Sequence, residues 1–497
     1  MDLYLQGHDY KYAAEQVLLT QFPQERPVYP DHPPRGDRAE LRLFPGKRWY
    51  TATCLLVWEG KRHRGTARVP AKEITGELLR DRLCQRAVKL AFYRACVARS
   101  GVRPPWGSLT GIRPAKLLTA SLEAGLSPRA ALRDFTRRYD VSPERAKLCL
   151  SAALASQEAK KTLEGRDVCL YVGIPFCPTR CAYCSFVSQS VEKSMKLIPP
   201  FLEALCREME ATGRAAAELG LRVVSVYMGG GTPTTLSPAE LELLCGRLEA
   251  EFDLAAVRDY SVEAGRPDTI TAEKLAVLRG HGVNRLSVNP QTMEDAVLEA
   301  IGRKHTAADV YRALELVRAA GDFAVNMDLI AGLPGDSPAG FSRTLDAVLA
   351  LGAENIAVHT LSLKKGARLT LERTPLPSAA AVGDMLTEAN RRLSGAGYAP
   401  YYLYRQKFMS GGFENVGWAL PGRENLYNIC IMEELCSILA MGGGGSTKLV
   451  DPVRGRIERV FAPKYPLEYI QGIDRVTGQK TKIKEFYHGI SAQGNQR

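Results

Sequence analysis

Three cysteines, Cys177, Cys181 and Cys184, lie close together in the segment CPTRCAYC. Their spacing, C-x3-C-x2-C, places three thiolates on one short loop, and no fourth cysteine is near. Three thiolates can hold three irons of a [4Fe–4S] cube, which leaves the fourth iron open to another ligand. A zinc site with one missing ligand is the competing interpretation, but the nearest histidines in the sequence are His63 and His281.

Polar groups or glycines also follow most of the apolar runs in the central part of the chain. These runs are CLYVGIPF, VVSVYMGGG, DYSVEAG, RLSVNPQ, AVNMDLIAGLP and NIAVHTLSL. The groups at or near their ends are Gly229, Gly230, Gly231, Thr232, Glu263, Asn289, Gln291, Asp328, His359 and Ser362. In a parallel β/α barrel the chemistry collects at the C-terminal ends of the strands. We therefore predict one site that combines these groups with the cysteines.

The glycine run Gly229–Gly231 has a physical reason to lie at such a site. Without Cβ atoms, the backbone can approach a ligand closely and present its N–H and C=O groups. Glu263, at the next strand end, could accept a hydrogen bond from a ribose hydroxyl or an amino group. The alternatives are a plain turn for the glycines, a solvent-facing carboxylate for Glu263, a buried structural acid for Asp328, and ordinary loop groups for Gln291 and Arg303.

Residues 161–400 alternate strand-like runs with helical segments, which predicts β/α units around a parallel sheet. Six units in this length suit a partial (β/α)6 barrel rather than a complete eight-stranded one. One of the helices opens with Ser237-Pro238-Ala239-Glu240, a capping box with proline at the first helical position.

The flanking regions have a different pattern. Residues 1–160 contain the strand-like segments ELRLFP, WYTATCLLVWEG and RHRGTARVP, followed by helices that begin at Ser127-Pro128 and Ser142-Pro143. This predicts an N-terminal accessory α/β domain. Residues 401–497 pass through the glycine-rich turn MGGGGS, and we expect a C-terminal α+β domain that covers or completes the barrel.

Composition limits the class of protein. The chain has 497 residues, 45% of them hydrophobic and 24% charged, which allows a core of normal size and two to four domains. No stretch reaches the length of an apolar membrane span, and the first residues do not form a secretory signal, so we expect a cytoplasmic protein.

Two further features of the composition bear on partners and redox state. The other nine cysteines are scattered singly in apolar runs, which predicts reduced, buried thiols. The net charge of +12 suits an acidic partner such as a polycarboxylate. The basic residues are spread out and are not interleaved with aromatic residues, so we expect no nucleic-acid partner.

The motif series resembles a known family. C-x3-C-x2-C with Tyr183 before its last cysteine is similar to the radical S-adenosylmethionine (SAM) superfamily. The segments YVGIPFCPTRCAYCSF, GGGTPT, SVEAGRPD, IGRKHT and NMDLIAGLPG resemble the oxygen-independent coproporphyrinogen III oxidase branch. SLTGIRPAK near the N-terminus and NLYNICIMEE near the C-terminus resemble the HemZ-type coproporphyrinogen dehydrogenases.

The resemblance implies an activity. A reduced [4Fe–4S] cluster would pass an electron to SAM, which splits into methionine and a 5′-deoxyadenosyl radical. That radical would abstract hydrogen from a propionate side chain of coproporphyrinogen III. Loss of CO2 and of one more electron then leaves a vinyl group, and two rounds give protoporphyrinogen IX. An electron donor such as flavodoxin or ferredoxin is implied as a partner.

The resemblance also implies residue roles. Cys177, Cys181 and Cys184 would bind the cluster. Tyr171, Gly230 and Glu263, with Gly229 in the same run, would contact the SAM on the cluster. The positions that correspond to a second SAM in relatives are Tyr183, Gly231, Thr232, Gln291, Arg303, Asp328 and Ser362. Ser362 stands where those relatives have a small apolar residue, so the expectation is one SAM molecule, or two.

Two differences from the motifs of the related families bear on a second candidate function. Phe186 occupies the position of a fourth cysteine in the well-known oxidases, and the related radical-SAM haem chaperones share this ending. The haem motif of those chaperones, His-Asn…Tyr-Trp, is absent, because this chain has Glu424-Asn425-Leu426-Tyr427-Asn428. A chaperone that binds and transfers haem is therefore the alternative to the enzyme.

Overall fold

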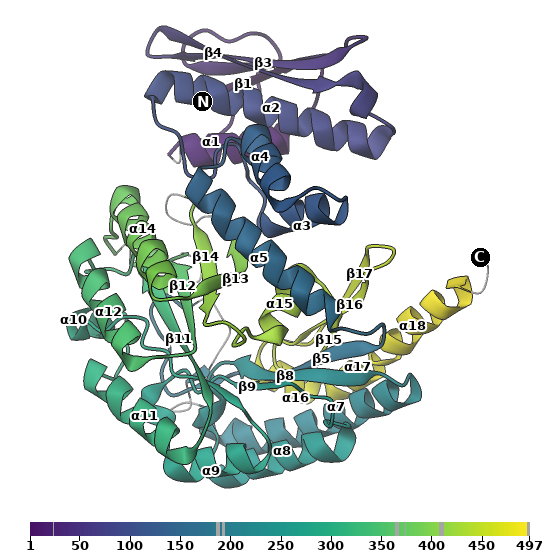
Figure 1. Ribbon diagram of the computed structural model, residues 1–497, viewed down its shortest axis with the longest axis vertical. Helices are drawn as coiled ribbons and strands as arrows, with labels where there is room; N and C mark the ends of the chain where they lie inside the picture. Colours follow the sequence, from purple (N-terminus) through teal and green to yellow (C-terminus); the bar gives the residue numbers. More distant parts are fainter. Residues whose placement is uncertain are drawn as a thin grey trace. The chain divides into compact units, whose positions relative to one another are not determined.

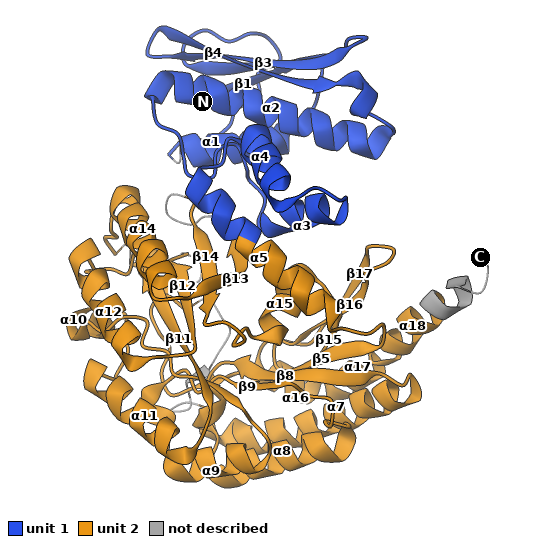
Figure 2. Ribbon diagram, viewed as in Figure 1, with its two compact units in different colours: residues 1–150 blue, residues 151–497 orange. Residues whose placement is uncertain are grey.

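The computed structural model describes residues 1–22, 24–184, 189–190, 194–362, 367–372, 374–406 and 412–494. The chain divides into two compact units, residues 1–150 and 151–497 (Figure 2). The boundary falls inside the helix α5 (Pro143–Lys161). No helix in these described ranges is long and apolar enough to cross a bilayer.

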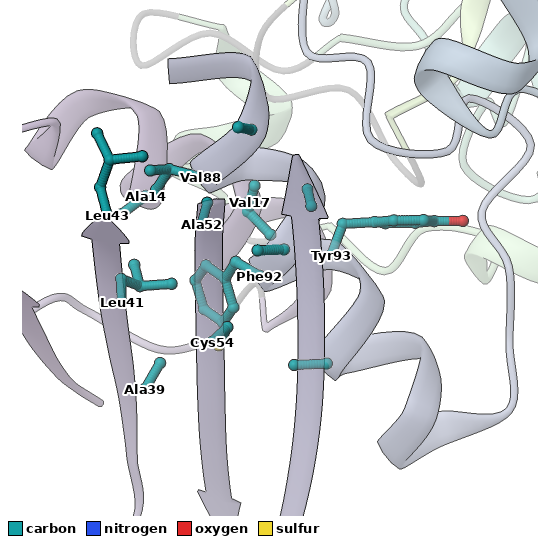
Figure 3. Packing of buried hydrophobic residues seen from close by; sticks show 14 of the residues in the cluster. Ala14, Val17, Ala39, Leu41, Leu43, Ala52, Cys54, Val88, Phe92 and Tyr93 are labelled. Atoms are coloured by element: carbon teal, nitrogen blue, oxygen red, sulfur yellow. The ribbon is translucent and has the colours of Figure 1, made fainter. Parts of the chain in front are cut away.

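The first unit is built on a four-stranded sheet in the order β1-β2-β3-β4. Its strands are β1 (Asp2–Gln6), β2 (Arg38–Phe44), β3 (Trp49–Trp58) and β4 (Lys61–Pro70), and its other helices are α1 (Lys11–Gln21), α2 (Glu77–Ser100), α3 (Ala115–Glu123) and α4 (Pro128–Tyr139). Alternate residues of β2 and β3 pack with α1 and α2 in one apolar core, shown in Figure 3. Strand β4, which contains the predicted strand-like segment RHRGTARVP, pairs antiparallel with β3 along its whole length.

Serine caps start the helices where the sequence places them. The Ser127 hydroxyl accepts a hydrogen bond from the backbone N–H of Ala130, and the Ser142 hydroxyl accepts one from Arg145. In the second unit, Ser237 and Glu240 form the predicted capping box at the start of α8. These caps satisfy backbone donors that the first turn of a helix leaves unpaired.

Six parallel strands form the centre of the second unit, as the alternating pattern predicts. They are β5 (Asp167–Ile174), β8 (Arg222–Gly230), β9 (Asp259–Val262), β10 (Arg285–Ser287), β11 (Ala324–Ala331) and β12 (Asn355–Thr360). Each pairs with the next in this order, and every pairing is parallel. All six C-terminal ends therefore lie at the same edge of the sheet.

Helices connect these strands and line the outer side of the sheet (Figure 1). They are α7 (Ile198–Glu218), α8 (Pro238–Glu251), α9 (Ala272–Gly280), α10 (Asp295–Ala300), α11 (Ala307–Ala320), α12 (Pro338–Leu351), the short α13 (Arg368–Leu371) and α14 (Ala379–Gly395). Neighbouring helices pack side by side, α7 on α8, α8 on α9 and α12 on α14. This is the mixed α/β architecture expected of a partial barrel.

The last hundred residues extend the same sheet at both edges. Strands β13 (Ala399–Arg405) and β14 (Glu414–Ala419) join the β12 edge, where β14 pairs antiparallel with β12. Strands β15 (Ser437–Gly442), β16 (Ser446–Asp451) and β17 (Arg456–Phe461) join the other edge, where β15 pairs parallel with β5. The sheet has eleven strands, and no pairing of described residues joins β13 to β17.

The remaining helices are α15 (Leu426–Glu433), α16 (Pro466–Gln471), α17 (Ile473–Gly478) and α18 (Thr481–Gly494). Helix α15 packs on β8 and β13, whereas α16 and α17 pack on α7. The C-terminal segment thus contributes both to the sheet and to the helices that cover it.

All twelve cysteines are without disulfide bonds. Of the nine outside the motif, eight are buried and Cys206 is half-buried, which agrees with the prediction of buried thiols.

Candidate functional site

The cysteine loop follows β5 and is held from several sides. The next strand holds its start, where the backbone N–H groups of Gly231 and Thr232 donate to the carbonyls of Ile174 and Phe176, each at 2.7 Å. The segment Phe176–Cys177 pairs with Gln189–Ser190 as the short strands β6 and β7. Further along the loop, Ala182 N–H donates to the Ile301 carbonyl at 2.9 Å. These bonds fix the backbone that carries the thiols.

Positive charge lies beside the thiols. Arg266 is 3% exposed; one of its nitrogens is 3.0 Å from Thr179 Oγ1 and 4.0 Å from Cys181 Sγ. The Thr232 hydroxyl donates to Cys177 Sγ at 3.6 Å. Burial, together with the guanidinium groups of Arg303 and Arg266, lowers the pKa of His305 to about 4. The guanidinium groups of Arg266 and Arg303 thus make the surroundings of the loop positive.

A cavity of about 420 Å³ opens beside the loop, within the range of small-molecule sites. Most of the predicted site residues line it, namely Cys177, Cys181, Tyr183, Cys184, Gly230, Gly231, Thr232, Glu263, Gln291, Arg303, Asp328 and Ser362. Tyr171 and Gly229 are not among its lining residues. The structure therefore brings together residues spread over nearly two hundred positions, and their individual roles stay predictions.

Glu263 lies between two donors from β8. Tyr227 Oη donates to Oε1 at 2.5 Å, and the Gly230 N–H donates to Oε2 at 3.3 Å. Burial raises the pKa of Glu263 to about 7; the hydrogen bond from Tyr227 opposes this rise and the charge of Asp328 adds to it. Glu263 is thus a carboxyl group that gains or loses its proton near neutral pH.

The three glycines are required for different reasons. A Cβ on Gly229 would lie 2.8 Å from Glu263 Oε2, so Gly229 makes room for that carboxyl group. Gly230 has a φ of +106°, in a region that favours glycine. A Cβ on Gly231 would collide with the Phe176 carbonyl and come within 2.8 Å of that of Ile174. Gly229 and Gly231 therefore leave space for neighbouring protein groups. That the run also approaches a ligand stays a prediction, and Gly230 and Gly231 line the cavity.

Asp328 is fixed by two asparagines. Asn289 Nδ2 donates to Oδ2 and Asn326 Nδ2 donates to Oδ1, both at 2.8 Å. His359 Nε2 lies 3.9 Å from Oδ1. Asp328 is half-buried, and its side chain lines the cavity together with Asn289, Asn326 and His359, so its role at a ligand stays a prediction.

The three predicted residues Arg303, Gln291 and Ser362 each have a different local environment. Arg303 donates to the carbonyls of Gly265 and Asn289 and to Tyr183 Oη, at 3.1, 2.8 and 3.2 Å. Gln291 has a φ of +69°, unusual for a residue with a side chain. Ser362 Oγ is buried and has no hydrogen-bond partner among the described residues, so it can serve a bound ligand.

The Tyr171 ring packs next to the site, against two other tyrosines. Its ring stacks 6.4 Å from Tyr227 and 6.3 Å from Tyr427, and those two rings lie 4.5 Å apart. Tyr171 Oη would be 3.2 Å from a Cβ on Gly230. We expect Tyr171 to position Tyr227 and Gly230, in addition to any contact that it makes with a ligand.

Sequence reasoning missed several lining residues. Tyr227, Arg266 and Asn326 lie in or just after the predicted strands, and period-two alternation could have placed Tyr227 and Asn326 on the inner face. The C-terminal segment adds Tyr402, Tyr404, Gln406, Asn415, Asn428 and Met432. No signal in the sequence identified these six, because their position depends on β13, β14 and α15 returning to the sheet. Phe186, which marks the departure from the oxidases, lies outside the described residues.

We expect Gly231→Ala to displace the backbone at residues 174–177 and to reduce the iron content of the reconstituted protein. The added methyl group meets backbone carbonyls, so the expected destabilisation is ~1–3 kcal/mol. Gly246→Ala is the matched control, because Gly246 lies in α8 with open space around it. Iron analysis and chemical denaturation measure both effects; equal iron content in the two variants would contradict the expectation.

The comparisons with known proteins agree with this geometry. A family model described as Radical SAM superfamily matches residues 171–348. The oxygen-independent coproporphyrinogen-III oxidase-like protein HemZ of Bacillus subtilis is 38% identical over 406 residues, which cover 81% of this chain and 81% of that protein. This chain belongs to the radical SAM superfamily, among the oxygen-independent coproporphyrinogen III oxidase-like proteins.

Two further similarities bear on function. The haem chaperone HemW of Bacillus subtilis is 36% identical over 192 residues, 38% of this chain and 49% of that protein. The solved structure of the Escherichia coli radical SAM enzyme coproporphyrinogen III oxidase (HemN) is similar with a TM-score of 0.52 and 25% identity, over 65% of this chain and 73% of that one. The two similarities point to different activities.

Membership of the radical SAM superfamily implies a [4Fe–4S] cluster and SAM as cofactors. The donor set fits both. Three thiols share one loop, and the cavity beside it contains two carboxyl groups, Glu263 and Asp328, and two guanidinium groups, Arg266 and Arg303. This mixture suits a ligand such as SAM, which carries an ammonium, a sulfonium and a carboxylate group. The number of SAM molecules stays a prediction.

Proposed function

We propose that this radical SAM protein catalyses the anaerobic oxidative decarboxylation of coproporphyrinogen III to protoporphyrinogen IX. The observation that carries the proposal is the extent of the similarity to HemZ, which spans 81% of both chains and so reaches well beyond the superfamily segment. The similarity to the HemW proteins of Bacillus subtilis and Escherichia coli covers 38% and 61% of this chain, less than the share that HemZ covers.

In this proposal the residues have separable tasks. Cys177, Cys181 and Cys184 bind three irons of the cluster. When bound, the cluster and SAM supply the 5′-deoxyadenosyl radical that removes hydrogen from a propionate side chain. Glu263, held by Tyr227 and Gly230, binds the cationic part of SAM. The walls of the cavity exclude water that would quench a radical.

The substrate class is consistent with the charge of the protein. Coproporphyrinogen III carries four propionates, and the net charge of +12 favours the approach of a polyanion. Around the mixed-charge centre, the cavity presents neutral donors on Asn415, Asn428, Tyr402 and Tyr404. Neutral donors can bind carboxylates without the cost of burying further charges. The proposal also requires an external electron donor, such as flavodoxin or ferredoxin, and a final electron acceptor.

The decisive test uses the full-length protein with its cluster reconstituted under anaerobic conditions. With SAM, a reductant, coproporphyrinogen III and an electron acceptor, we expect 5′-deoxyadenosine and protoporphyrinogen to form together. Reactions without SAM and with Cys184→Ala are the controls, and both are expected to give neither product. Cleavage of SAM without conversion of the porphyrinogen would contradict the proposed function.

A haem chaperone is the second candidate, and one structural observation favours it. His359 and Met432 both line the cavity, and each is a side chain that can ligate haem iron. The chaperone hypothesis expects stoichiometric haem uptake with a visible Soret band that His359→Ala weakens, and transfer of haem to an acceptor protein. The enzyme hypothesis expects no such uptake, so titration of the purified protein with haem separates the two.

A further inference from the structure

Three cysteines outside the motif meet in the interior of the second unit. Cys169 lies in β5, Cys430 in α15 and Cys436 directly before β15. Their sulfurs all lie within 4.8 Å of one another, and those of Cys169 and Cys436 are 3.6 Å apart. In the part of the chain that the structure describes, no other three histidine, cysteine, aspartate or glutamate ligand atoms come this close.

This spacing matches the demands of one metal ion. A metal–thiolate bond of ~2.3 Å in tetrahedral geometry places neighbouring sulfurs ~3.8 Å apart. The Cys169–Cys436 separation of 3.6 Å is close to that value and the other two separations are at most 4.8 Å, so an ion could bind with small side-chain rotations. We propose that Cys169, Cys430 and Cys436 form a second metal site, which binds a single thiophilic cation, Cu⁺ or Zn²⁺.

The surroundings of the site favour Cu⁺ of the two. Thiolates are soft ligands that select Cu⁺ and Zn²⁺, but structural zinc almost always takes four ligands. No imidazole or carboxylate of the described residues completes a fourth position within the same distance. Val224, Leu426 and Ile438 form an apolar shell around the sulfurs. A bound cation would offset the repulsion among three buried thiolates.

The proposed metal site lies next to the helix α15, which forms one wall of the cavity. Cys430 shares α15 with Asn428 and Met432, which line the cavity, and with Tyr427, whose ring stacks on those of Tyr171 and Tyr227. A metal ion would tie α15 to β5 and to the start of β15. Occupancy would therefore fix the helix that forms one wall of the cavity, whether the protein is an oxidase or a chaperone.

The test is metal binding by the full-length chain with the cluster ligands removed, so that iron sites do not interfere. The Cys177→Ala/Cys181→Ala/Cys184→Ala protein, purified anaerobically, is expected to bind about one Cu⁺ or Zn²⁺ per chain in competition with a chromophoric chelator. Separate Cu⁺ and Zn²⁺ titrations distinguish the two ions, and Co²⁺ is expected to give a thiolate charge-transfer band. Metal is also expected to raise the midpoint of thermal unfolding by several degrees.

Variants of the site supply the controls. In the same background, Cys430→Ala is expected to lower the affinity at least tenfold and to remove the Co²⁺ band. Cys245→Ala, which removes a buried thiol from α8, is expected to leave both unchanged. Absence of stoichiometric binding, equal effects of the two substitutions, or a Cys169–Cys436 disulfide in the anaerobic protein would each overturn the proposal. Far-UV circular dichroism on each variant establishes that a loss of binding is not a loss of fold.

Discussion

Cys181→Ala is expected to abolish both the brown iron–sulfur absorption of the reconstituted protein and its cleavage of SAM. Each thiolate of the motif is expected to hold one iron, and the sequence of the loop has no fourth cysteine that could replace Cys181. Arg266, which lies 4.0 Å from its sulfur, would be left beside a methyl group. Iron and sulfide analysis, with detection of 5′-deoxyadenosine, measures the effect.

Cys245→Ala and Cys206→Ala are the matched controls for this prediction. Cys245 lies buried in α8 and Cys206 lies half-buried in α7, and neither lines the cavity. Both variants are expected to keep full iron content and SAM cleavage. If either of them lost the cluster as Cys181→Ala does, the assignment of the three ligands would be wrong.

The second prediction concerns Glu263 and pH. With a pKa of about 7, this carboxyl group is mostly protonated at pH 6 and mostly ionised at pH 8. Because the ionised form attracts a cation, SAM affinity of the wild-type protein is expected to rise about tenfold between these pH values. Glu263→Gln is expected to bind SAM about tenfold more weakly at pH 8 and to lose this pH dependence. Calorimetric titration at both pH values measures it.

Glu263→Gln, which is expected to weaken SAM binding, is expected to stabilise the fold. Glu263 has a higher pKa in the folded protein than in the unfolded chain, so its favourable contribution, full below the unfolded value of 4.5, is lost as pH rises through 7. Glu263→Gln is therefore expected to raise the free energy of unfolding by ~3 kcal/mol at pH 8 and by little at pH 5. Denaturant unfolding at the two pH values tests this result.

Asp336→Asn is the control for both measurements. Burial raises the pKa of Asp336 to about 6, but this residue does not line the cavity. The variant is expected to change stability with pH while it leaves SAM affinity and its pH dependence as in the wild type. A Glu263→Gln protein whose SAM affinity matched that of Asp336→Asn at pH 8 would exclude the proposed contact.

Local sequence patterns predicted the parts of the fold that depend on local physics. Alternating apolar runs placed all six parallel strands, and Ser127, Ser142 and Ser237 marked helix starts correctly. Because parallel strands end at one edge, all of the predicted site residues except Tyr171 and Gly229 line one cavity. Their chemical roles stay predictions.

What the sequence could not predict depends on long-range pairing. Cys169 and Cys436 are separated by 267 positions, and no local pattern marks that their strands are neighbours. Tyr402 and Asn415 line the cavity only because β13 and β14 pair at the β12 edge. Gly229 has its role because Glu263, on another strand, needs the space of a side chain.

The pairing of β5 with β15 also determines when the outer edge of β5 is covered during synthesis of the chain. Val168 lies opposite Ser437, so the outer edge of β5 is covered only after residues 437–442 have been synthesised. Until then the nascent chain exposes an apolar strand with unpaired backbone groups, the kind of edge that recruits other chains.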